Sequence, residues 1–165
     1  MDENTKFQEL IKKIERMKKS GEIDLSTEED LSIAVMNLIS LEEHFFFTSA
    51  KTGKVEYLDM LSEIREIRKS LLKKLISKHE GETWCISKHL LGATMRLIEV
   101  GTKLYSDGKK DEAKTVFNKA HELYSIFWGL RLKLIDMPEI KKAAKNEKPW
   151  TLKDILNKLV DCCDE

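Results

Sequence analysis

The stretch that decides the fold is residues 83–134, which read TWCISKHLLGATMRLIEVGTKLYSDGKKDEAKTVFNKAHELYSIFWGLRLKL. Apolar side chains recur every three to four residues on both sides of Ser106-Asp107-Gly108, which is the spacing of one face of an α-helix. A serine, an aspartate and a glycine in succession are typical of a connection between helices. The stretch therefore predicts two long helices, over about 83–105 and 110–134, that pair as an antiparallel hairpin.

This hairpin carries small and bulky residues in a defined order, namely Leu97, Gly101, Leu104, Gly108, Ala113, Phe117 and Ala120. Their order and spacing resemble the tetratricopeptide-repeat (TPR) hairpin over about residues 94–125. The resemblance implies that Gly101 and Ala120 lie where the two helices cross and that Phe117 fills the groove between them. Ser125 stands where that family usually has proline, and a single copy covers roughly a fifth of the chain. We therefore expect TPR-like packing of one hairpin and no repeat array.

The helical spacing continues through the rest of the chain. It predicts helices over about 5–19, 27–50 and 55–78, and a last amphipathic helix over 151–161 with Leu152, Ile155, Leu156 and Leu159 on one face. Ser26, with Glu29 three residues later, predicts the capping box of the second helix. The expected buried face of the third helix comprises Tyr57, Leu61, Ile64, Ile67, Leu71 and Leu75.

Short connections between these helices predict an all-α protein with an up-down topology. We expect an antiparallel bundle of four long helices, within about 27–135, with a short amphipathic helix at each end. The bundle domain would span residues 1–138. Residues 139–165 would form a lysine-rich linker followed by the C-terminal amphipathic helix.

Composition narrows the classes of function. The chain has 165 residues, 29 basic and 29 acidic side chains, and therefore no net charge, which disfavours nucleic acid as a partner. Residues 1–20 are amphipathic rather than signal-like, and no apolar stretch approaches the length of a membrane span. The odd number of cysteines, Cys85, Cys162 and Cys163, indicates a reducing compartment, so we expect a cytoplasmic protein.

One set of residues suggests a metal site. His44, Glu63, Glu99 and His121 lie on the four long helices at similar heights if those helices fold antiparallel. Carboxylates and histidines from four helices are the ligands of di-iron bundles, but the chain lacks the Glu-x-x-His pair that such sites use. Each of the four also falls at the edge of its apolar face. Hydrogen bonds and salt bridges at the helix boundaries are the other interpretation.

A second set concerns arginines on apolar faces. Arg68 falls between Ile64, Leu71 and Leu75, and a buried arginine is costly unless it is paired. We expect Arg68 to be at least half buried and to pair with Glu42 or Glu99. The alternative is an anion or phosphate site formed by Arg65, Arg68 and Arg96. Arg131 also lies on an apolar face, beyond Phe127, but near the end of the bundle, a position from which its head group can reach solvent.

No Gly-rich phosphate loop, nucleophile elbow or HExxH motif occurs in the chain. The sequence favours a non-enzymatic helical interaction or scaffold protein without a cofactor, whose partner is another protein or a second copy of the chain. The alternative is a four-helix protein that binds a metal or small ligand through His44, Glu63, Glu99 and His121. A helical nucleic-acid-associated module is the third hypothesis.

Overall fold

The computed structural model describes residues 3–21, 24–76 and 83–134. These residues form five α-helices: α1 (Glu3–Lys19), α2 (Leu25–Thr52), α3 (Glu56–Leu75), α4 (Thr83–Ser106) and α5 (Lys110–Arg131). No β-strand occurs in these ranges, which confirms the all-α class for them. The expected linker and C-terminal helix, residues 139–165, lie outside the described residues.

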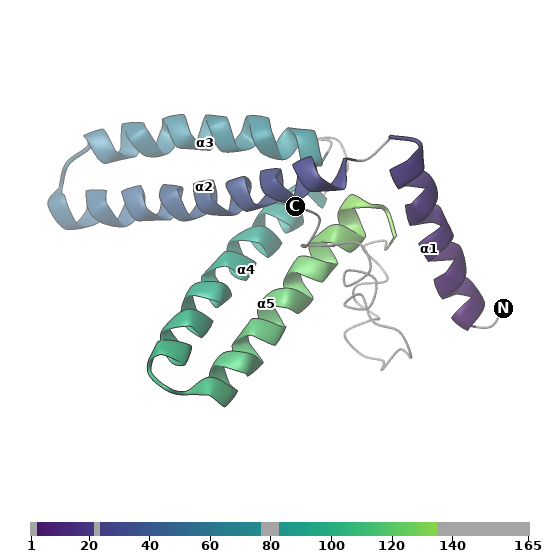
Figure 1. Ribbon diagram of the computed structural model, residues 1–165. Helices are drawn as coiled ribbons and strands as arrows, with labels where there is room; N and C mark the ends of the chain where they lie inside the picture. Colours follow the sequence, from purple (N-terminus) through teal and green to yellow (C-terminus); the bar gives the residue numbers. More distant parts are fainter. Residues whose placement is uncertain (1–2, 22–23, 77–82, 135–165) are drawn as a thin grey trace.

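The helices pair in chain order as two antiparallel hairpins, α2 with α3 and α4 with α5, and α2 also packs on α4 (Figure 1). The antiparallel pairing expected from the short connections is thus confirmed. The two hairpins do not run side by side along their whole lengths, however. They meet at one end and diverge toward their turns, so that α2 and α4 form the inner walls of a V (Figure 1).

The hydrophobic core lies where the two hairpins meet, and we call this region the junction. All five helices contribute to it: its buried members are Ile14, Val35, Met36, Leu72, Leu75, Ile76, Leu91, Phe127, Trp128 and Leu132. These residues come from the second half of α1, the first half of α2, the end of α3, the first half of α4 and the end of α5. Because the apolar burial is concentrated at the junction, the distal halves of the hairpins extend from it as two arms.

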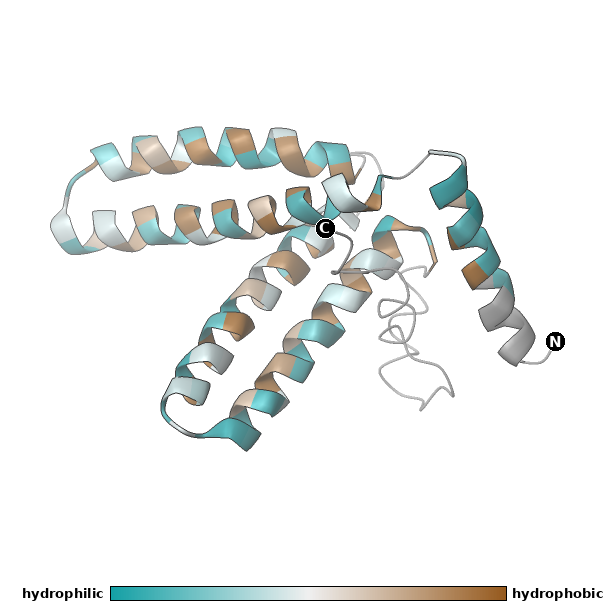
Figure 2. Cartoon of the chain, in the orientation of Figure 1, coloured by the Kyte–Doolittle hydropathy of each residue, from teal (hydrophilic) through white to brown (hydrophobic). Residues whose placement is uncertain are grey.

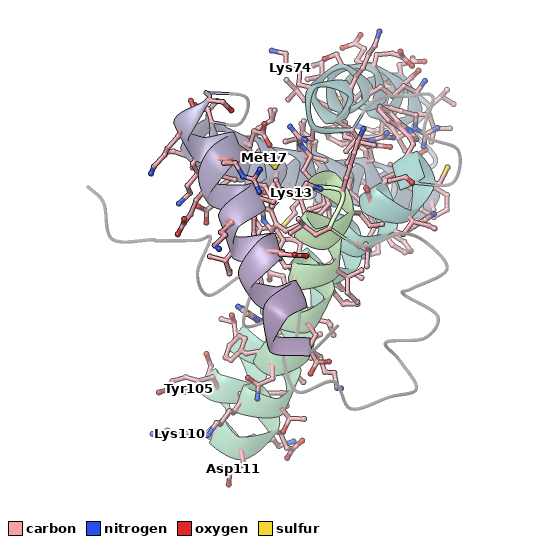
Figure 3. All side chains as sticks on the ribbon, turned by 90° about the vertical axis from the view of Figure 1, so that its right-hand side faces the viewer. Lys13, Met17, Lys74, Tyr105, Lys110 and Asp111 are labelled. Atoms are coloured by element: carbon pink, nitrogen blue, oxygen red, sulfur yellow. The ribbon has the colours of Figure 1, made fainter. Side chains whose placement is uncertain are left out.

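Helix α1 covers one side of the junction. Ile14 is buried there, and Ile11 and Met17 pack against the core, which accounts for the apolar stripe of the N-terminal helix as far as its side chains are described. The ammonium of Lys13 donates a hydrogen bond of 3.2 Å to the backbone carbonyl of Lys133, just beyond α5. In Figure 3, α1 passes in front of the end of α5, with Lys13 beside it. The N-terminal helix therefore belongs to the same core.

Local signals fix the ends of α2. The side chain of Asp24, not Ser26, caps its N-terminus, because the Asp24 carboxylate accepts a hydrogen bond of 3.2 Å from the backbone N–H of Thr27. The capping box predicted from Ser26 and Glu29 is therefore wrong. At the other end, Gly53 has φ of 69° and its N–H donates to the carbonyl of Ser49, a left-handed ending that glycine adopts without strain.

The α4–α5 hairpin closes tightly around one glycine. A Cβ on Gly101 would lie 2.5 Å from Cε1 of Phe117, so the phenyl ring sits directly against the α4 backbone. Ala113 and Ala120, the small residues of α5, are buried in the same hairpin. Small residues on both helices thus let the axes approach closely, with Phe117 in the groove between them.

Candidate functional site

The most buried charged cluster joins α2 to α3. Arg68 is 5% exposed, and its Nε donates to Oε1 of Glu42 at 2.7 Å while one of its terminal nitrogens donates to Oε2 at 3.3 Å. Arg65 donates from its Nε to the same Oε2 at 3.0 Å. Both carboxylate oxygens therefore bind guanidinium groups, and Glu42 is the partner of Arg68.

The environment of Glu42 affects its titration. Burial by itself would raise the pKa of the carboxyl, but the hydrogen bonds from Arg68 and Arg65, with their positive charges, outweigh that effect and hold the pKa below its ordinary value. Glu42 is thus ionised and compensates charge on the two arginines. The cluster therefore consists of two ion pairs on one carboxylate. The guanidinium nitrogens that face Glu42 donate their hydrogen bonds to it.

The other two arginines singled out by the sequence bind elsewhere. Arg96, on α4, pairs with Glu43 of α2 across the inner face of the V, and both side chains are about half exposed. Arg96 therefore lies outside the Glu42 cluster. A terminal nitrogen of Arg131 donates to Glu28 at 2.6 Å, with the two side chains only 19% and 15% exposed. The head group of Arg131 is thus only partly exposed, because it pairs with Glu28 at the start of α2.

The proposed metal ligands are not brought together. His44, Glu63 and Glu99 are exposed and His121 is partly buried, each on a different helix. Within the described ranges, no group of three or more His, Cys, Asp or Glu side chains could hold a metal ion. The divergence of the two arms explains this result, since residues at equal heights on α2–α3 and α4–α5 become separated as the hairpins splay (Figure 1).

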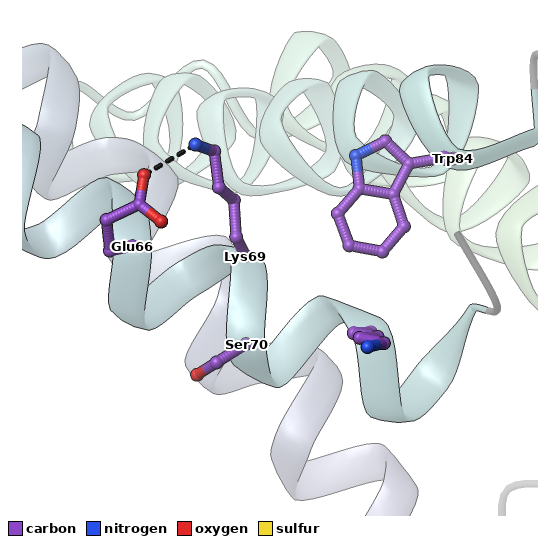
Figure 4. Close-up of a pocket in the computed structure, with 5 residues that line it drawn as sticks. Glu66, Lys69, Ser70 and Trp84 are labelled. Atoms are coloured by element: carbon purple, nitrogen blue, oxygen red, sulfur yellow. Dashed lines mark hydrogen bonds and ion pairs between the residues drawn. The ribbon is translucent and has the colours of Figure 1, made fainter. Parts of the chain in front are cut away.

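An open pocket lies between α3 and the start of α4 (Figure 4). It is lined by Glu66, Lys69, Ser70, Lys73 and Trp84. A hydrogen bond from the Lys69 ammonium lowers the pKa of Glu66, whose carboxylate remains in solvent. The four lining residues from α3 are all exposed, so the pocket has no buried polar group to orient a ligand.

The most distinctive surface is apolar. Ten large hydrophobic side chains are exposed in the described part of the chain, and seven of them belong to the α2–α3 hairpin: Ile33, Phe46, Phe47, Val55, Leu58, Met60 and Ile67. Four of these gather around the α2–α3 turn, with exposed fractions of 53% for Phe46, 50% for Phe47, 63% for Val55 and 43% for Leu58. We call these four residues the tip patch. Figure 2 shows hydrophobic residues recurring along α2 and α3, and it shows a hydrophilic α4–α5 turn.

The other arm differs in kind. Its most exposed hydrophobic side chain, Tyr105 at 55%, has the ammonium of Lys110 5.6 Å from its ring centre (Figure 3). A cation over an aromatic face is a favourable contact at an exposed site. The tip of the α4–α5 hairpin is thus charged and hydrophilic. Among the described residues, it carries no apolar cluster comparable to the tip patch.

The sequence contained a signal for the tip patch. Phe45, Phe46 and Phe47 are consecutive, and successive residues on a helix are about 100° apart, so all three cannot face one neighbouring helix. Phe45 packs toward α3, where its ring stacks on that of Tyr57 with the ring centroids 6.3 Å apart. Phe46 and Phe47 are exposed. The helical spacing also placed Ile67 on the buried face of α3, which is wrong, since Ile67 is 49% exposed.

Comparison of the chain with known protein families, curated proteins and solved structures finds no match. Among the described residues, no helix combines the length and apolar character needed to cross a membrane.

Proposed function

We propose that this chain is a non-enzymatic helical interaction protein that binds a protein partner through the tip patch. The observation that carries the proposal is the concentration of half-exposed apolar side chains, Phe46, Phe47, Val55 and Leu58, at the far end of one arm. Exposed apolar side chains that cluster on a folded protein are candidates for an interaction site, and the rings of Phe46 and Phe47 contact each other with their centroids 5.2 Å apart. Aromatic side chains are also the residues that contribute most to binding at protein interfaces.

The arm supplies a rigid support for such a patch. The Glu42 ion pairs hold α2 against α3, the Phe45–Tyr57 stack lies closer to the turn, and Gly53 closes the hairpin. The patch is therefore presented on two helices with fixed ends, which reduces the conformational entropy lost on binding. The TPR-like spacing of the second hairpin supports the same class of function, since that family consists of interaction modules.

The absence of catalytic motifs from the sequence supports a non-enzymatic role. The cysteine pattern, with Cys85 exposed as a free thiol, supports a cytoplasmic location. The partner is either another protein or a second copy of the chain. Separate measurements of self-association and of binding to other proteins distinguish these two.

The test replaces two aromatic residues of the patch and compares a matched pair on the other arm. Phe46→Gln with Phe47→Gln removes the largest apolar area without disturbing the junction, and glutamine is a good helix former. Ile98→Gln with Val100→Gln is the control, because these two are 39% and 40% exposed on α4. Sedimentation velocity measures self-association, and quantitative affinity capture from the cells that produce the protein measures binding of another protein.

We expect the patch variant to lose binding by about tenfold or more, as hot-spot aromatics do, and the control to bind like the wild type. Loss of self-association in sedimentation would identify the partner as a second copy. Loss of a captured protein alone would identify a different partner. Equal binding by wild type and patch variant in both assays would refute the proposal.

A further inference from the structure

A second apolar surface lies on a different side of the α2–α3 arm. Met60 and Ile67 are 47% and 49% exposed on α3, although both are large and hydrophobic. Together with Glu56 and Glu63 they are spaced by four, three and four residues, which places all four on one face of the helix. We call this face the α3 stripe. It alternates carboxylates with apolar side chains.

The carboxylates of the α3 stripe are available to a partner. Glu56 and Glu63 are both exposed, and neither makes an ion pair with another described residue. Between residues 56 and 67, α3 carries Glu56, Asp59, Glu63 and Glu66 against the single basic residue Arg65. A helix that fits this stripe should therefore combine apolar side chains for Met60 and Ile67 with basic side chains that can reach Glu56 and Glu63.

Residues 151–161 of this chain have that pattern. Leu152, Ile155, Leu156 and Leu159 form an apolar stripe at helical spacing, and Lys153 and Lys158 fall on its opposite flanks in a helical projection. Leu152 and Leu159 are seven residues apart, as are Met60 and Ile67, so two apolar contacts can form in register about 10.5 Å apart along each helix. An isolated helix of this length is marginal in water and needs an apolar surface to cover its stripe.

The connection is long enough for this contact within one molecule. Leu134 packs against the junction core, and α3 ends in that core at Leu75. Along α3, Met60 lies only about 22 Å from Leu75 at 1.5 Å per residue. The sixteen residues 135–150 can extend to roughly 53 Å, so the tether reaches the whole stripe. Such a tether also gives the segment a high effective concentration near the stripe.

We propose that residues 151–161 fold back on their own chain and pack as an amphipathic helix against the α3 stripe, with Lys153 and Lys158 beside its carboxylates. This inference is independent of the proposed function, because the α3 stripe and the tip patch are different surfaces. Either one can fail while the other stands.

Disulfide cross-linking in the full-length chain tests the contact. In a background with Cys85→Ser, Cys162→Ser and Cys163→Ser, Ile67→Cys is combined with Leu156→Cys, and the control combines Ile98→Cys with Leu156→Cys. Ile98 is also exposed on a helix that starts at the junction. We expect the Ile67 pair to form a disulfide within one chain at least about tenfold faster than the control. Equal rates, or a covalent dimer as the main product, would overturn the proposal, the latter in favour of a second copy.

Charge reversal tests the proposed contacts of Lys153 and Lys158 with the carboxylates of the α3 stripe. Lys153→Glu with Lys158→Glu should slow the Ile67–Leu156 cross-link a few-fold, since each exposed pair contributes little. Adding Glu56→Lys and Glu63→Lys should restore the rate. Failure of the second pair to restore it would overturn the proposed charge pairing.

Hydrogen exchange provides a measurement on the chain without added cysteines. Exchange in residues 151–161 should be slowed in the wild type and should rise several-fold in the variant Met60→Ser with Ile67→Ser. Ile98→Ser with Val100→Ser should leave it unchanged. Unprotected exchange in the wild-type segment would overturn the proposal.

Discussion

At the scale of single residues, Glu42 and its two arginines are not equivalent. Replacing Arg68 by methionine leaves Glu42 hydrogen-bonded to Arg65 and places an apolar side chain among apolar neighbours. We expect this substitution to be neutral or stabilising. Replacing Glu42 by leucine instead leaves a buried guanidinium without its partner, so the free energy of unfolding should fall by about 3–5 kcal/mol. Urea unfolding measures both.

The exposed pair Glu43–Arg96 is the control for this comparison. Glu43→Ala should change the free energy of unfolding by less than about 1 kcal/mol. If Glu42→Leu were as mild as Glu43→Ala, the burial that the structure gives Arg68 would be contradicted.

The lowered pKa of Glu42 also predicts a pH dependence. Its folded-state pKa lies below the ordinary value of 4.5, so the unfolded chain takes up this proton first as the pH falls. The stability due to Glu42 is therefore complete above the unfolded pKa and is lost as the pH falls through the folded pKa. Thermal melts of wild type and Glu42→Gln should differ most near neutral pH and converge in acid. A difference that grows as the pH falls would contradict this sign.

At the scale of helices, the close contact between α4 and α5 depends on Gly101. Gly101→Ala would gain up to about 1 kcal/mol in helix propensity, but its Cβ would lie 2.5 Å from the Phe117 ring. Overpacking of this kind costs about 1–3 kcal/mol, so we expect net destabilisation. In a double-mutant cycle, Phe117→Leu should relieve much of that cost. Additive effects in chemical denaturation would show that the ring does not rest on Gly101.

The helices were the part of the fold that the sequence predicted best. Apolar spacing identified every described helix, and polar turns at Gly53 and Gly108 located the ends of the two hairpins. The pairing of Arg68 with Glu42 was also among the predicted alternatives, because a charge on an apolar face needs a partner. Capping was less predictable, since Asp24, Ser26 and Thr27 are all plausible caps and only geometry selects Asp24.

The angle between the hairpins could not be predicted in this way. Helical spacing shows which face is apolar but not how far along that face a neighbour extends. Ile39 packs next to Gly92 of α4, yet Phe46, seven residues later on the same side of α2, is exposed because the hairpins diverge. The same divergence separates His44 and Glu63 from Glu99 and His121, whose expected proximity assumed parallel hairpins.

At the scale of the whole molecule, the core at the junction, as far as the described residues show it, draws on α1 to α5. We expect deletion of residues 149–165 to leave a helical protein that unfolds cooperatively. A modest fall in melting temperature is compatible with loss of the proposed contact on α3. Loss of the cooperative transition in circular dichroism melts would show that these residues belong to the main core.

The most direct test of the central claim is the distance between the two arm tips. The three natural cysteines are replaced by serine, and spin labels are attached at Lys54→Cys and Lys109→Cys. Pulsed electron–electron double resonance then measures the distance between the two labels. Hairpins that diverge from the junction predict a distribution well beyond the ~10 Å spacing of packed helices. A single short distance would mean that the arms close into a parallel bundle, which would contradict the V-shaped arrangement and the exposure of the tip patch that depends on it.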